Sequence, residues 1–214
     1  IISDYYSQYL PKDRQQEVAH RYIQGVYRLA KELTQAFPEV LFEGSAAGGN
    51  RFDLGMLCFF PQIWASDNTD AVYRVNGMNG YSYGYPMSVM GAHVSSCPNH
   101  QTLRITPLET RFAVAAFGVL GYECNLCDMK KEDLEEIRKQ IALYKEWRNV
   151  LQYGTFYRGR NAKIHEWTCV SEDKRQAVGM IMQELTQPNH PTEQYFPKGL
   201  DAPKRYEFTN RSMR

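Results

Sequence analysis

The sequence lacks an excess of charge of either sign. Its 214 residues include 25 Lys and Arg against 24 Asp and Glu, which gives a formal net charge of +1. No stretch of the chain concentrates basic residues. Proteins that bind nucleic acid or anionic membranes by electrostatic attraction need such a concentration. The sequence therefore predicts no nucleic-acid partner and no membrane partner.

Long hydrophobic runs and a disulfide framework are missing as well. The longest apolar runs fall well short of a membrane-spanning helix of about eighteen residues, and the N-terminal residues lack the pattern of a signal peptide. The five cysteines are odd in number and are not spaced as a disulfide framework. We therefore expect free thiols and a reducing compartment, the cytoplasm.

Metal-ligand spacings are also lacking. Cys124 and Cys127 form a lone CxxC pair with no second pair to complete a zinc or redox site. His93 and His100 lie seven residues apart, without a carboxylate at metal-ligand spacing. Buried thiols and histidines in a loop or the core are the simpler interpretation. We predict no metal and no organic cofactor.

Nucleotide-binding and serine-hydrolase motifs are absent too. The glycine-rich stretch over 43–53, EGSAAGGNRFD, contains neither a Gly-Lys-Ser/Thr loop nor GxGxxG, which argues against a phosphate site. Ser45 does not lie in a G-x-S-x-G elbow, which argues against a nucleophilic serine. The small residues indicate a tight turn or a close approach of backbone to a ligand. Arg51 and Asp53 either pair with each other or order the loop.

What the sequence does contain is an alternation of strand-like and helix-like segments. Hydrophobic residues make up 43% of the chain, enough for a sizeable core. The alternation predicts a parallel sheet with helices outside, and active sites in such folds gather where strands end. The predicted elements are a helix over 14–37, a strand within 39–49, a short helix within 51–60, a strand over 62–67, a helix over 69–79, a strand within 85–96, a helix followed by a strand over 110–121, and a helix over 130–149.

The character of the chain changes at about residue 153. Four short, β-prone stretches follow, separated by turn residues. They are GTFYRGR, IHEWTCV, AVGMIMQEL and RYEFTN. We expect an all-β segment there.

The densest polar cluster is WASDNTDA, over 64–71, which follows an apolar run. If Asp67 ends a strand, it points into the mouth of the sheet. A carboxyl group beside the face of Trp64 would have its charged form disfavoured and could donate a proton near neutral pH. In the alternative interpretation, Ser66 or Asp67 caps the next helix and Asp70 lies in its first turn. The two interpretations are compatible, because one aspartate can cap while the other reacts.

Several stretches together resemble one known family, glycoside hydrolase family 36, the bacterial α-galactosidases. They follow the order and spacing of the family across most of residues 1–157, and their combination is highly specific although no single piece is. The stretches are FPEVLFEGSAAGGNRFDLGML, PQIWASDNTDA, YPMSVMGAHVSSCPNHQTLRITPLETR, FGVLGYE and QYGTFYR.

The resemblance implies a retaining α-galactosidase on a (β/α)8 barrel, acting on terminal α-galactosyl groups of oligosaccharides such as raffinose and melibiose. Residues 1–152 would form the part of the barrel that holds strands five to eight. Residues 153–214 would begin the C-terminal β-sandwich. Family members often form oligomers, so the full-length enzyme would be a homo-oligomer.

The resemblance also assigns roles to individual residues. Asp67 matches the general acid/base, and Trp64 matches a tryptophan that lines the galactose pocket. Gly48 matches a loop glycine whose backbone contacts sugar hydroxyls. Ser45 stands where the family usually has a cysteine beside the 2-position of the sugar. Arg51 matches a loop arginine near the acid/base.

The chain departs from the family pattern in its nucleophile. The family's nucleophile is an aspartate in a Lys-Trp-Asp motif, which normally lies just before the equivalent of ISDYYS. The chain starts at Ile1, so the resemblance implies a fragment of a longer enzyme. A retaining mechanism needs two carboxyl groups about 5–5.5 Å apart. Within the family geometry, neither Asp53 nor Asp70 can be the partner of Asp67. A sugar-binding remnant without catalysis is the rival interpretation.

A second departure is GSAAGG in place of the commoner loop with a cysteine. Ser45, Ala46 and Ala47 are all small. More room near the 2-position would admit an amino or N-acetyl group. An α-N-acetylgalactosaminidase or α-galactosaminidase is therefore the alternative to an α-galactosidase.

Overall fold

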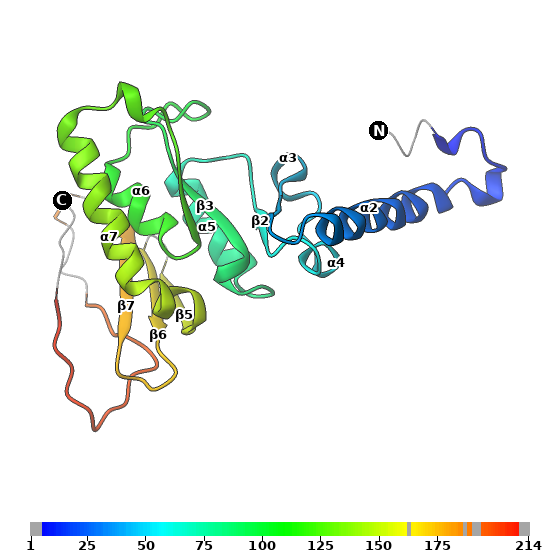
Figure 1. Ribbon diagram of the computed structural model, residues 1–214. Coiled ribbons are helices and arrows are strands. Elements are labelled where there is room, and N and C mark those ends of the chain that lie inside the picture. Colours follow the sequence, from blue (N-terminus) through cyan, green and yellow to red (C-terminus); the bar gives the residue numbers. More distant parts are fainter. Residues whose placement is uncertain (1–5, 162–163, 186–187, 190–193, 210–214) are drawn as a thin grey trace.

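The computed structural model describes residues 6–161, 164–185, 188–189 and 194–209 (Figure 1). They form a four-stranded parallel sheet, here sheet A, followed by a three-stranded antiparallel sheet, sheet B. This is the partial barrel followed by a β domain that the sequence predicted. Sheet A has the order β1-β2-β3-β4, and its strands are β1 (Glu43–Gly44), β2 (Gln62–Trp64), β3 (Met90–Ser95) and β4 (Val119–Glu123).

Helices alternate with these strands as predicted, although β1 and β2 are much shorter than expected. In Figure 1, α2 projects away from the rest of the molecule, and α7 contacts sheet B. No helix in the described part of the chain is long and apolar enough to cross a membrane. The α-helices are α2 (Glu17–Ala36), α4 (Leu54–Leu57), α5 (Ala71–Tyr81), α6 (Leu108–Ala115) and α7 (Lys131–Tyr153). The segment labelled α3 (Ala46–Gly49) is a single turn with positive φ throughout. Within the described residues, three 3₁₀ turns complete the order, η1 (Lys12–Arg14), η2 (Met87–Val89) and η3 (Leu126–Asp128).

The two faces of sheet A differ in chemistry. Successive strand residues point to opposite faces, and laterally paired residues share a face. On β3, Met90, Ala92 and Val94 are fully buried, and α5 and α6 contact this strand. The alternate residue His93 shares the opposite face with Trp64, because their strands pair in register. The helices therefore cover an apolar face, and the aromatic and titratable side chains lie on the other.

Three of the four stretches that were predicted to be β-structure after residue 153 form the strands of sheet B. Its strands are β5 (Thr155–Asn161), β6 (Ile164–Val170) and β7 (Ala177–Gln183), paired in that order. The prediction for RYEFTN is wrong, since residues 205–209 form no strand. The hydroxyl of Tyr206 donates to the carbonyl of Lys174 at 2.7 Å, so this segment is held to the β6–β7 turn by a side chain instead of a strand ladder.

One tryptophan joins sheet B to the helices of sheet A. Trp167 on β6 is fully buried. Its ring meets the edges of Phe117 and Phe156 at centroid distances of 5.4 and 5.8 Å. Its Nε1 donates to Oδ1 of Asn79 on α5 at 3.2 Å. At this junction the indole ring of Trp167 is therefore buried among apolar groups while its N–H is hydrogen-bonded.

Truncation of this tryptophan should destabilise the protein strongly. We expect Trp167→Ala to lower the free energy of unfolding by about 3–5 kcal/mol, because it empties a packed site and leaves the amide of Asn79 without its partner. Chemical denaturation followed by circular dichroism measures the change. Ile181→Ala on β7, where the side chain is exposed, is the matched control. Equal losses for the two variants would contradict the central role of Trp167.

Candidate active site

The loop after β2 is shaped by its own short polar side chains. Ser66 Oγ accepts the backbone N–H of Asn68, and Asn68 Oδ1 accepts that of Asp70, both at 3.2 Å. Asp70 Oδ1 then accepts the N–H of Val72 at 3.0 Å, which makes Asp70 the N-cap of α5. The alternative that Ser66 or Asp67 caps this helix is wrong, because the loop makes one more turn before the helix begins.

Asp70 is a buried structural carboxylate. Its side chain is only 2% exposed, and Oδ2 accepts from Thr102 Oγ1 and from Arg104 Nε, each at 2.8 Å. Burial alone would raise the pKa of Asp70. The hydrogen bonds from Arg104, Thr102 and Val72 outweigh burial, so the pKa lies below its ordinary value. Asp70 is therefore ionised and fully engaged.

Asp67 is the opposite case. Its side chain is exposed, and within the described residues it makes no hydrogen bond or ion pair. The backbone of Asp67 lies against Gly48 of the loop after β1, where a Cβ would lie 2.8 Å from the nitrogen of Asp67. Next to it, a Cβ at Gly49 would lie 2.6 Å from the carbonyl oxygen of Ala65. The loops after β1 and β2 thus touch backbone to backbone at these glycines.

The loop after β1 forms a left-handed turn. Ala46 and Ala47 have φ of 58° and 51°, and the two glycines that follow continue the turn at 74° and 94°. The N–H of Gly49 donates a hydrogen bond of 2.9 Å to the carbonyl oxygen of Ser45, which closes the turn. Left-handed alanines cost roughly 1–2 kcal/mol each. Strain of this kind persists only where surrounding structure enforces it, and it concentrates at functional sites.

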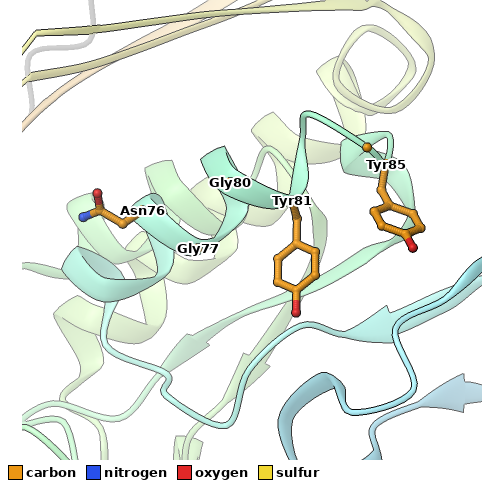
Figure 2. A pocket seen from close by; sticks show the side chains of 6 residues that line it. Asn76, Gly77, Gly80, Tyr81 and Tyr85 are labelled. Atoms are coloured by element: carbon orange, nitrogen blue, oxygen red, sulfur yellow. The ribbon is translucent and has the colours of Figure 1, made fainter.

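An aromatic cluster holds this strained loop in place. Phe52 is buried, with its ring centroid 4.6 Å from that of Tyr81 and 4.8 Å from that of Tyr85. Figure 2 shows the rings of Tyr81, the last residue of α5, and Tyr85, in the loop after it, projecting in the same direction, with Asn76 pointing elsewhere. A hollow of about 420 Å³ beside them contains none of the predicted site residues; it is lined by Asn76, Gly77, Gly80, Tyr81, Gly84 and Tyr85.

Arg51 and Asp53 do not pair with each other. Asp53 caps α4 by accepting the N–H of Met56 at 2.9 Å, and it accepts the hydroxyl of Tyr27 at 3.0 Å. Asp53 therefore orders the loop, one of the two interpretations left open by the sequence. Arg51 is half-buried and makes no hydrogen bond or ion pair in the described part of the chain.

Trp64 lies at the last position of β2 and is only 7% exposed. The guanidinium carbon of Arg74 lies 4.2 Å from the centre of the indole. The ring of His93 lies at a centroid distance of 4.4 Å, tilted by 36°. Trp64 is therefore covered by Arg74 and His93, and the place in the galactose pocket that the resemblance implies for it stays a prediction.

Sequence reasoning overlooked Arg74 and gave His93 no specific role. Burial lowers the pKa of Arg74 to about 10, against the opposing effect of the Glu123 carboxylate. Burial and the charge of Arg74 lower the pKa of His93 to about 4, so this imidazole is neutral at pH 7. One signal was available. Arg74 is the fourth residue of its helix, near the end where the macrodipole disfavours a cation.

Of the three aspartates in the loops after β1 and β2, Asp67 is the one whose carboxyl group is free within the described structure. Asp67 can transfer a proton, while Asp53 and Asp70 are both occupied in capping helices. Within the described residues, no three His, Cys, Asp or Glu side chains are placed to hold a metal ion. The structure brings Gly48 directly against Asp67, and Ser45 lies one turn away in the same loop. Trp64 belongs to a separate cluster with Arg74 and His93.

The similarity to known proteins extends over nearly the whole chain. The Melibiase family model matches residues 1–154, and the model of the glycosyl hydrolase family 36 C-terminal domain matches residues 164–213. Alpha-galactosidase AgaA of Geobacillus stearothermophilus is 44% identical over 92% of this chain and 28% of its own length. Alpha-galactosidase 1 of Pediococcus pentosaceus is 48% identical over 84% of this chain and 25% of its own length.

Solved structures give the same answer. The α-galactosidase from Lactobacillus brevis superimposes with a TM-score of 0.86 at 49% identity, over 90% of this chain and 26% of that one. A variant of AgaA in complex with raffinose superimposes with a TM-score of 0.86 at 43% identity, over 90% of this chain and 27% of that one. The chain thus spans about a quarter of the length of the relatives it matches. It belongs to glycoside hydrolase family 36, the family of the melibiases.

Proposed function

We propose that this chain is the acid/base-bearing part of a retaining α-galactosidase. The observation that carries the proposal is Asp67, an exposed carboxylate with no partner among the described residues, held at the carboxyl end of β2 against the Gly48 loop. The names of the relatives and the raffinose and stachyose bound in related structures support terminal α-galactosyl groups as the substrate.

In the proposed reaction, Asp67 protonates the glycosidic oxygen as the bond breaks and later removes a proton from water. Backbone groups around Gly48 contact the sugar hydroxyls, and Ser45 lies near the 2-position. Arg51, which has no partner in the described structure, faces substrate or the acid/base. Trp64 lines the pocket beside them.

The proposed reaction also requires a carboxylate nucleophile that attacks the anomeric carbon. We assign this group to a part of the enzyme outside these 214 residues, since the relatives are about four times as long as the matched region. We place the end of the barrel portion at residue 152 and the β-sandwich from 153 onward. Free cysteines, three of them exposed, favour the cytoplasm, and the full-length enzyme is proposed to be a homo-oligomer.

A second candidate substrate is the α-galactoside with an amino or N-acetyl group at the 2-position. The observation in its favour is the exposed Ser45 followed by Ala46 and Ala47, which leave the loop without a large side chain. The relatives described above carry the name α-galactosidase, so galactose stays first.

Substrate choice can be measured directly on the full-length enzyme. We expect kcat/KM for an aryl α-galactoside to exceed that for the matching α-N-acetylgalactosaminide by at least about tenfold, roughly what a misfit of 1.4 kcal/mol would cause. Faster cleavage of the N-acetylated substrate would reverse the choice.

Replacement of the proposed acid/base should remove most activity. We expect Asp67→Asn to lower kcat by about 10²- to 10⁴-fold while the fold stays intact, because proton transfer by a placed side chain contributes about this much. The loss should be greater for raffinose than for an aryl galactoside, whose leaving group needs less protonation. Asp128→Asn, at an exposed aspartate after β4, is the control. Near-normal hydrolysis of raffinose by Asp67→Asn would refute the assignment and favour a sugar-binding remnant.

The glycine beside Asp67 should be sensitive to a single methyl group. Gly48→Ala introduces a Cβ 2.8 Å from the backbone nitrogen of Asp67, at a φ of 74° that alanine rarely adopts. We expect kcat/KM to fall by at least about tenfold, because a small displacement of a reacting group has effects of up to about 10²-fold. Gly80→Ala, where a Cβ meets open space, is the matched control. Unchanged kinetics for Gly48→Ala would show that the contact does not position Asp67.

A further inference from the structure

Arg74 is a buried cation with no carboxylate at ion-pair distance among the described residues, and the charge of Glu123 acts on it only from further away. The residue is 7% exposed and forms no ion pair within the described part of the chain. Its Nη1 donates to the carbonyl oxygen of His93 at 3.2 Å, and its guanidinium lies 4.2 Å from the centre of the Trp64 indole. Burying a charge without a close opposite charge is costly, so the contacts that Arg74 does make are the ones to examine.

A second buried arginine, on the next helix, can be compared with Arg74. Arg111 on α6 is 8% exposed, and like Arg74 it donates to a carbonyl of β3, that of Ser95. It also donates to the carbonyl of Thr106 at 3.0 Å. Each arginine therefore ties its own helix to the same strand. Of these two arginines, Arg74 lies over an aromatic ring and Arg111 does not, so the stacking on Trp64 is what distinguishes Arg74.

The surroundings of Trp64 show what the stacking does. A Cβ at Gly91 would lie 3.2 Å from Cε3 of Trp64, so the indole rests against the bare backbone of β3. On β4, a Cβ at Gly121 would lie 2.5 Å from the ring of His93, which rests there in the same way. Arg74 adds a planar cation over the indole and a hydrogen bond to the strand beneath it. Together these contacts hold the indole down on the sheet.

We propose that Arg74 is a positioning residue for the sugar site and acts through Trp64. With its guanidinium in place, the indole is held against β3 and leaves the space above the sheet to the sugar. Without it, the indole loses its cover and rotates into that space, so substrate binding weakens while proton transfer at Asp67 continues. This inference rests on the proposed α-galactosidase function.

The kinetic test uses the full-length enzyme with raffinose as substrate. We expect Arg74→Met to raise KM by about 10- to 30-fold, the equivalent of a desolvated cation–π contact, with kcat changing less than about threefold. Arg74→Lys keeps a charge over the ring and should recover part of the loss. Arg111→Met removes an equally buried arginine and should lower stability without changing KM. An unchanged KM in Arg74→Met, or an equal rise in Arg111→Met, would overturn the proposal.

A second readout does not depend on activity. In protein labelled with 5-fluorotryptophan, the ¹⁹F signal of Trp64 is assigned as the one lost in Trp64→Phe. We expect Arg74→Met to make this signal sensitive to exchange of H₂O for D₂O, as in an exposed indole, while Arg111→Met leaves it unchanged. An unaltered signal in Arg74→Met would overturn the proposal even in an active enzyme. Failure of the proposed function is recognised separately, because the unmutated enzyme would then cleave no α-galactoside.

Discussion

The arrangement depends on one steric constraint, the approach of the loop after β1 to the backbone of Asp67. A side chain at position 48 would lie 2.8 Å from the Asp67 nitrogen, so the contact exists only with glycine there. The approach is made possible by a left-handed turn that includes Ala46 and Ala47, a costly conformation for alanine. Phe52, which follows the turn in the chain, packs on Tyr81 and Tyr85 and holds the turn in place. Strain in the loop is thus maintained by apolar packing on α5.

Helix α5 links the site to the rest of the molecule. Its N-cap, Asp70, fixes the loop that presents Asp67, and it is itself held by Thr102 and Arg104 from the loop after β3. Near its other end, Asn79 accepts the indole N–H of Trp167 from sheet B. The β domain therefore packs on the helix that orders the candidate site. A division of roles follows, in which Asp70 is buried and engaged while Asp67 is exposed and free to react.

Local patterns in the sequence predicted the order of elements well, and distant contacts decided the rest. The helical segments and the parallel arrangement of sheet A followed from periodicity and alternation. The cap of α5 did not, because Asp70 is selected by partners 32 and 34 residues away in the chain. RYEFTN has the composition of a strand but forms a side-chain contact at Tyr206. The cover on Trp64 was likewise unpredictable, since Arg74 and His93 reach it from different elements. The roles of Asp67 and Gly48 in catalysis stay predictions, although their contact is present in the structure.

The most direct test of the role of Asp67 is the anomeric configuration of the product formed when azide rescues Asp67→Gly with an activated aryl α-galactoside. If Asp67 is the acid/base, the glycosyl-enzyme intermediate still forms, and azide takes the place of water in the second displacement. The product is then α-galactosyl azide, with retained configuration. A β-galactosyl azide would mean that Asp67 is the nucleophile, and the absence of any rescue would contradict its role in proton transfer.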